Sequence, residues 1–115
     1  MTKKMKIETV PYRDGLMTEL RDPELAAEYL KQAASDPSHP ERLLKALRNV
    51  AEARGMTEVA RGADVARPGL YKMLSAEGNP SYTSMVAILS TVGLKLTVEP
   101  IKAARRKSGR KSAAA

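Results

Sequence analysis

The sequence lacks cysteine, phenylalanine and tryptophan, and its only aromatic residues are four tyrosines. Without cysteine the chain has no disulfide and no thiolate for catalysis or metal binding. Without the two largest apolar aromatics, the core must be built from Leu, Ile, Val, Met and Ala, as in many small helical bundles. These absences favour a small helical protein of a reducing compartment.

Long apolar runs are also missing. No stretch approaches the roughly 20 residues that a membrane-spanning helix needs. The basic residues near the start, within 1–10, are not followed by the apolar segment of a signal peptide. We therefore expect a cytoplasmic protein with no membrane contact. A length of 115 residues suits one small domain with a modest core.

Residues that could carry catalysis are sparse. The single histidine, His39, sits between Pro37 and Pro40, with no second histidine or cysteine at ligand spacing. Gly62 and Gly69 are isolated and form no glycine-rich phosphate loop. We expect no enzyme activity, no catalytic residue, no metal, no cofactor and no small-molecule substrate. Function should therefore lie in binding.

The positive charge is concentrated at one end. The formal net charge is +7, and residues 101–115 hold six of the 20 basic residues and no acid. The rest of the chain is nearly neutral. We predict that residues 101–115 form a disordered basic tail. The tail either adds nonspecific affinity for phosphates or is a solubilising extension, and the sequence leaves both interpretations open.

Two helices are predicted in the first half of the chain. Asp22 and Pro23 are typical of a helix start, and Pro40 begins a second helix that Gly55 ends. Before them, residues 6–10 alternate like a short strand and Asp14-Gly15 suggests a turn, so residues 1–22 should be an extended segment. Residues 23–40 then form a helix and linker, whose apolar stripe holds Leu25, Ala26, Tyr29, Leu30 and Ala33.

The second half has the layout of a helix-turn-helix DNA reader within residues 41–100. Thr57 is predicted to cap a short helix, residues 62–65 to form a turn, and residues 68–75 to form the reading helix. Ala60 is the small residue at the crossing of the two helices, and Val65 is the apolar anchor. A helix over 82–92 follows, with Met85, Val86, Ile88, Leu89 and Val92 inward. The alternative is that these are merely three short helices of a bundle.

A short C-terminal strand is predicted after this helix. Leu94, Leu96 and Val98 alternate with polar residues, and Pro100 ends the pattern.

The predicted DNA contacts lie on the outer face of the reading helix and near helix starts. Arg67, at the start of the reading helix, is the best candidate for base readout, and Lys72 points outward. Tyr71 either touches the DNA backbone or packs on a neighbouring helix. The full set of candidates is Thr57, Arg61, Arg67, Pro68, Tyr71, Lys72, Ser75, Asn79 and Ser81.

Six segments in register carry a resemblance to a known family. They are Thr9-Val10-Pro11-Tyr12-Arg13-Asp14, Ala26-Ala27-Glu28-Tyr29-Leu30, Ala53-Arg54-Gly55-Met56-Thr57, Leu70-Tyr71-Lys72-Met73-Leu74, Gly78-Asn79-Pro80-Ser81 and Val92-Gly93-Leu94-Lys95-Leu96. With these, residues 8–98 resemble the HigA-type antitoxins, an addiction module antidote family. Their all-α fold is a lambda-repressor-like helix-turn-helix bundle. The chain departs from this family at Ala66, where a serine is usual, and at Pro68-Gly69, where the family is more helix-friendly.

The resemblance implies two activities and their partners. One is neutralisation of a small RelE/HigB-like ribonuclease toxin of a type II toxin–antitoxin module. The other is repression of the chain's own operon by a homodimer on a palindrome in double-stranded DNA. The sequence leaves open a free-standing regulator without a toxin, and a toxin-binding module that no longer reads specific DNA.

Residues 6–35 are the predicted toxin contact. A strand followed by an amphipathic helix would suit the addition of a strand to another protein's sheet and of a helix to its groove. The candidate residues are Ile7, Val10, Tyr12, Leu16, Leu20, Leu25, Tyr29 and Leu30.

Overall fold

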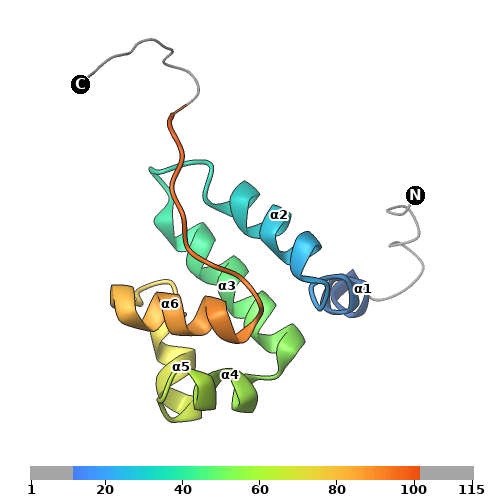
Figure 1. Cartoon of the computed structure of the whole chain (residues 1–115), viewed down its shortest axis with the longest axis vertical. Coiled ribbons are helices and arrows are strands. Elements are labelled where there is room, and N and C mark those ends of the chain that lie inside the picture. The colour runs from blue at the N-terminus through green and yellow to red at the C-terminus, as the bar shows by residue number, and fades with distance from the viewer. Residues whose placement is uncertain (1–11, 102–115) are drawn as a thin grey trace.

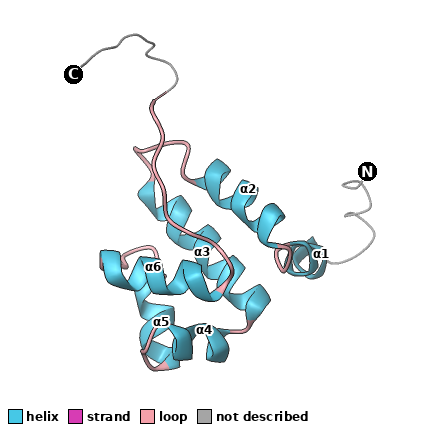
Figure 2. Ribbon diagram, in the orientation of Figure 1, coloured by secondary structure: helices cyan, strands magenta, loops and turns pink. Residues whose placement is uncertain are grey.

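Six helices make up the part of the chain that the computed structural model describes, residues 12–101 (Figure 1). No strand occurs within this range (Figure 2). The all-α class is therefore confirmed. The helices are α1 (Tyr12–Glu19), α2 (Pro23–Ala33), α3 (Pro40–Arg54), α4 (Met56–Gly62), α5 (Arg67–Met73) and α6 (Tyr82–Thr91).

Helix α3 lies at the centre of the arrangement. It contacts α1, α2 and α4, and α4 in turn contacts α5 and α6. In Figure 1, α1 and α2 lie on one side of α3, and α4, α5 and α6 lie on the other. Leu47, Val50 and Ala51 of α3 are almost completely buried. One aliphatic core therefore joins the two halves, as expected for a chain without large apolar aromatics. Within residues 12–101, no helix is long and apolar enough to cross a membrane.

The predicted helix starts are confirmed where a side chain or a proline sets them. Asp22 accepts a hydrogen bond from the backbone N–H of Glu24 at 2.9 Å, and Pro23 is the first residue of α2. Ser81 caps α6 in the same way, accepting from the N–H of Ser84 at 3.1 Å. Gly55 separates α3 from α4 with φ of 119°, a conformation that residues with a side chain rarely adopt.

A polar connection fastens α1 and α2 to α3. The buried amide of Asn49 donates to the Tyr29 hydroxyl at 2.8 Å and accepts from the Arg13 guanidinium at 3.2 Å. Arg13 also pairs with Glu52. Between α1 and α2, Arg21 donates to the backbone carbonyl of Ala53 at 3.2 Å. Side chains from three consecutive helices, 20 to 39 residues apart in the chain, thus share one hydrogen-bonded cluster.

The turn predicted at Asp14-Gly15 is wrong, because both residues lie inside α1, and the extended segment predicted over residues 1–22 is wrong over the residues of that helix. Glycine in a helix costs about 1 kcal/mol relative to alanine. Leu16 and Met17 pack against the core, and Arg13 bonds to α3. These tertiary contacts outweigh the local preference. The strand predicted over residues 6–10 lies outside the described residues.

The C-terminal strand predicted from Leu94 to Val98 is also wrong, since this segment has no regular structure. A strand needs a neighbour to complete its hydrogen bonds, and none lies beside this segment within residues 12–101.

Two other predictions from the sequence differ from the structure. Thr57 lies inside α4, with Gly55 at the cap position. Val86 is 37% exposed rather than inward, because α6 carries more apolar residues than its buried face accommodates.

Asn49 gives a test of the connection between α1, α2 and α3. Asn49→Ala should lower the free energy of unfolding by about 1–3 kcal/mol, because it removes the hydrogen bonds to the half-buried Tyr29 hydroxyl and to the Arg13 guanidinium. Tyr29→Phe, which removes one hydroxyl, should cost about 0.5–1.5 kcal/mol. Denaturant unfolding of both single variants and the double variant provides the measurement. A stability loss in the double variant that equals the sum of the two single losses would contradict a shared network.

Candidate nucleic-acid interface

The candidate interface is built on α4, α5 and the four residues between them, 63–66. The N–H of Val65 donates to the carbonyl of Ala60 at 3.0 Å, which closes the turn. Asp64 has φ of 61°, in the left-handed region that aspartate tolerates better than most residues. The two short helices predicted from the sequence are therefore present. The second begins at Arg67 and ends at Met73, rather than spanning residues 68–75.

The inner faces of this unit form its apolar support. Ala60 is buried at the predicted crossing, and Leu70 of α5 is completely buried. Val65 is partly buried and packs against the core, as an anchor before the second helix should. On the opposite side of α4, Gly62 lies so close to Thr91 of α6 that a Cβ atom would collide with the threonine side chain. The position of α4, and with it that of α5, is thus set by close packing.

Arg67 is held by two neighbours on the outside of the unit. Its guanidinium lies over the Tyr71 ring, 5.8 Å from the centroid, and donates to the Thr57 hydroxyl at 3.4 Å. Arg48 of α3 lies over the same ring at 5.2 Å and donates to Glu52 at 3.3 Å. Such cation–π contacts contribute about 0.5–1 kcal/mol each at exposed sites. Tyr71, itself half-buried, packs on neighbouring helices and positions Arg67.

Three further candidates meet at the end of α5. Lys72, Ser75 and Asn79 line one shallow hollow, together with Gly69 and the acidic Glu77. The Ser75 hydroxyl donates to the backbone carbonyl of Lys72 at 2.9 Å, so it is already engaged.

The remaining candidates lie around this cluster. Arg61 on α4 and Pro68 on α5 are exposed. Ser81 uses its hydroxyl as the cap of α6, so its side chain already has a structural role.

Helix α5 begins without a side-chain cap. Ala66 has the extended backbone of a cap residue, with φ −73° and ψ 151°, but no oxygen to accept from the first amides. Gly69 faces open space, since no atom lies within 4 Å of where its Cβ would be. The two departures from the family pattern therefore both fall on the exposed first turn of α5.

The predicted toxin contacts divide into core and surface. Leu20 and Leu30 are buried in the chain's own core, and Leu16 and Tyr29 pack against it. Leu25 is 46% exposed. It therefore does not lie on the buried face of α2, where the predicted apolar stripe placed it. Ile7 and Val10 lie outside the described residues, as does the side chain of Tyr12.

Sequence reasoning missed the residues of α3 that connect these regions. Arg48 and Glu52 are four residues apart, a spacing that indicates a helical ion pair. Nothing in the sequence indicates that Arg48 meets Tyr71, or that Glu52 meets Arg13. Both contacts depend on how α1 and α5 pack against α3.

The linker between α2 and α3 holds a separate charged cluster. Ser38 donates its hydroxyl and its backbone N–H to Asp36, which lowers the pKa of that carboxyl. The pKa of Glu41 is lowered by hydrogen bonds from its own backbone N–H and from His39. Within residues 12–101, no three histidine or carboxylate side chains gather as metal ligands do.

Comparison with known proteins identifies the family. A family model described as "Probable addiction module antidote protein" matches residues 14–100. The chain belongs to this antidote family. The match begins inside α1 and covers α2 through α6 completely. The resemblance to an antidote family is therefore confirmed.

One relative of this chain is an uncharacterised protein of Haemophilus influenzae. The two are 39% identical over 59 residues, which is 51% of this chain and 61% of the relative. The alignment thus spans less than two thirds of the relative's length. No solved structure matches the antidote.

The missing cap gives a test of the start of α5. Ala66→Ser should raise the free energy of unfolding by about 0.5–2 kcal/mol, because the new hydroxyl can accept from a free amide of the first turn. The control is Ala76→Ser, at an exposed position after α5 where no helix begins. Thermal unfolding compares the two. Equal stability of both variants would contradict the assignment of Ala66 as the cap position.

Proposed function

We propose that this antidote neutralises a RelE/HigB-like ribonuclease toxin and represses its own operon by sequence-specific DNA binding. The observation that carries the DNA-binding part is the set of three exposed cations on the α4–turn–α5 unit. Arg61, Arg67 and Lys72 present guanidinium and ammonium groups there, above a completely buried Leu70. A rigid, cationic short helix supported by a core is what entry into a major groove requires.

In this proposal, Arg67 and Lys72 have different tasks. Tyr71 and Thr57 hold Arg67 at the start of α5, where a guanidinium can donate two hydrogen bonds to the edge of a guanine. Lys72 and Asn79, at the other end of α5, would contact phosphates and set the register. Repression would follow by occlusion, with two copies of the chain in successive major grooves in the cytoplasm. No step requires chemistry by the antidote, so we propose no enzymatic activity.

The toxin contact is proposed to involve α1, α2 and the residues that precede them. The buried Leu20 and Leu30 would support this surface from within, and exposed side chains such as Leu25 would touch the toxin. The toxin would be neutralised by coverage of its active surface. Separate surfaces for toxin and DNA are consistent with the arrangement in Figure 1, where α2 and α5 lie on opposite sides of α3.

DNA reading is tested by a gel shift with the chain's own promoter and with scrambled DNA. The unmodified chain should prefer the promoter by at least about 10³-fold. Arg67→Ala should weaken promoter binding by about 1–3 kcal/mol and relax specificity, while Lys72→Ala should weaken binding to all sequences and lower the salt dependence. Lys45→Ala, at an exposed position of α3, is the control and should leave binding unchanged.

Equal, salt-sensitive binding to both DNAs would overturn the operator-reading part of the proposal. It would favour the alternative in which the chain is a toxin-binding module that has lost specific DNA reading, a state consistent with the uncapped start of α5.

Toxin neutralisation is tested by point substitutions, because removal of residues 1–20 would also delete Leu20 from the core. Leu25→Glu should abolish growth rescue and co-purification with the toxin of its module, and should leave promoter binding intact. Val86→Glu is a matched control on α6, since both side chains are apolar and exposed. Full neutralisation by the Leu25 variant would show that α2 is not the contact.

A further inference from the structure

The segment after α6 exposes apolar side chains on an unpaired backbone. Val98 is 91% exposed, Ile101 78% and Leu96 44%. Within residues 12–101, no backbone hydrogen bond involves residues 95–101. The segment runs along one side of α3 towards the α2–α3 linker (Figure 1). Unsatisfied N–H and C=O groups beside exposed apolar side chains form a template for pairing with another strand.

The sequence of this segment is complementary to itself when it is reversed. We propose that residues 94–100 of two copies of this chain pair as antiparallel strands about a two-fold axis at Thr97. In this register Lys95 lies opposite Glu99 of the second copy, and Leu96 lies opposite its Val98. Thr97 faces its own equivalent. Opposite charges, apolar pairs and threonine pairs are all favourable cross-strand neighbours.

The charged residues determine which residue lies on the two-fold axis. Moving the axis by one residue in either direction removes both Lys95–Glu99 pairs, and it places Glu99 opposite Gly93 or Thr97 of the other copy. Within the described residues, neither Lys95 nor Glu99 forms an ion pair in the chain itself. The complementary charges therefore favour a second copy over a toxin as the occupant.

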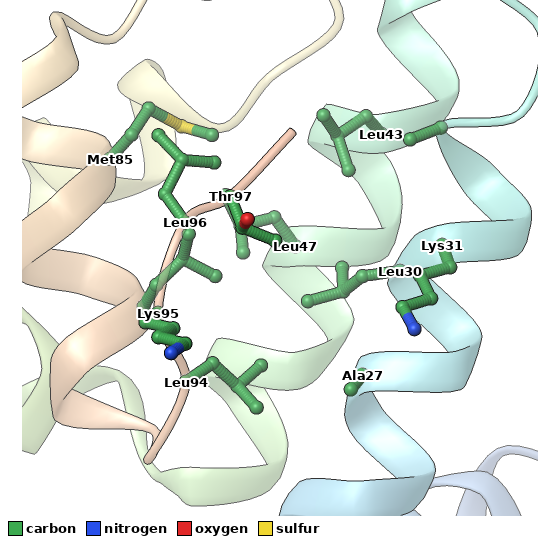
Figure 3. A pocket seen from close by; sticks show the side chains of 12 residues that line it. Ala27, Leu30, Lys31, Leu43, Leu47, Met85, Leu94, Lys95, Leu96 and Thr97 are labelled. Carbon is green, nitrogen blue, oxygen red and sulfur yellow. The ribbon is translucent and has the colours of Figure 1, made fainter. Parts of the chain in front are cut away.

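The fold supplies the support that a two-stranded ribbon needs. Such a ribbon is marginal in water unless it packs against an apolar surface. Leu94 and Leu96, with their neighbours Lys95 and Thr97, line a groove whose walls come from α2, α3 and α6 and include Leu30, Leu43 and Leu47 (Figure 3). Since side chains alternate along a strand, Leu96 and Val98 of the second copy would lie on the same face of the ribbon. The pairing would cover apolar surface that the single chain leaves open.

This interface would hold together the two copies that the proposed operator binding needs. The inference rests on the proposed function only for the biological role of the dimer. Its test uses no DNA and no toxin. Failure of promoter binding in a dimeric protein would count against the proposed function alone. A monomeric chain that still neutralises toxin would count against the interface alone.

Charge reversal tests the register in the full chain by sedimentation equilibrium. Lys95→Glu and Glu99→Lys should each raise the dimer dissociation constant about tenfold, because two symmetry-related attractions become repulsions. The double variant, Lys95→Glu with Glu99→Lys, should return to within about threefold of the original value. Circular dichroism checks that each variant folds. A chain that stays monomeric, or single variants that dimerise unchanged, would overturn the proposal.

A cysteine at the axis gives an independent readout, since the chain has no cysteine of its own. Thr97→Cys should form a covalent dimer on mild oxidation, because residues facing each other across an antiparallel pair bring their Cβ atoms within about 4.5–5.5 Å. Thr83→Cys, exposed on α6, is the matched control and should remain monomeric. Equal cross-linking of the two variants would contradict an axis at Thr97.

Discussion

The burial of α3 is the constraint on which the rest of the structure depends. Leu47, Val50 and Ala51 are almost completely covered, with α1 and α2 on one side of the helix and α4 to α6 on the other. With no phenylalanine or tryptophan available, many small aliphatic contacts must replace a few large ones. Each of these contacts contributes less to stability if the neighbouring helix shifts, since close-packed interiors tolerate little change in volume. The short helices α4 and α5, which would be unstable alone, hold their positions through this core.

Polar contacts then connect the two halves across the same helix. On one side Arg13 and Tyr29 bond to Asn49. On the other, Arg48 lies over Tyr71. Glu52 joins the two sides, because it accepts from both Arg13 and Arg48. The proposed toxin-contacting and DNA-reading surfaces are therefore attached to one rigid helix, and each can be altered by substitution without rebuilding the other.

The exposed apolar groups that remain have different physical meanings. Val86 on α6 is a single exposed side chain, which is ordinary on a protein surface. Leu25 on α2 belongs to the proposed toxin contact. The segment from Leu96 to Ile101 is different, because its backbone also lacks partners within the described residues. The period-two pattern does not correspond to a strand within the described residues; in the proposed dimer it would place Leu96 and Val98 on one face of the ribbon.

The sequence by itself determined the helices that have their own start and stop signals, namely α2, α3 and α6, and the class of fold. It also determined the family, since six segments in register resemble an antidote and the family match covers residues 14–100. These features depend on local chemistry, in which a cap, a proline or a glycine acts within one turn. Tertiary structure alone decided that Asp14-Gly15 is helical, that Leu20 belongs to the core, and that Arg48 of α3 rests on Tyr71 of α5. Each of those outcomes depends on packing between residues far apart in the chain, which no local pattern records.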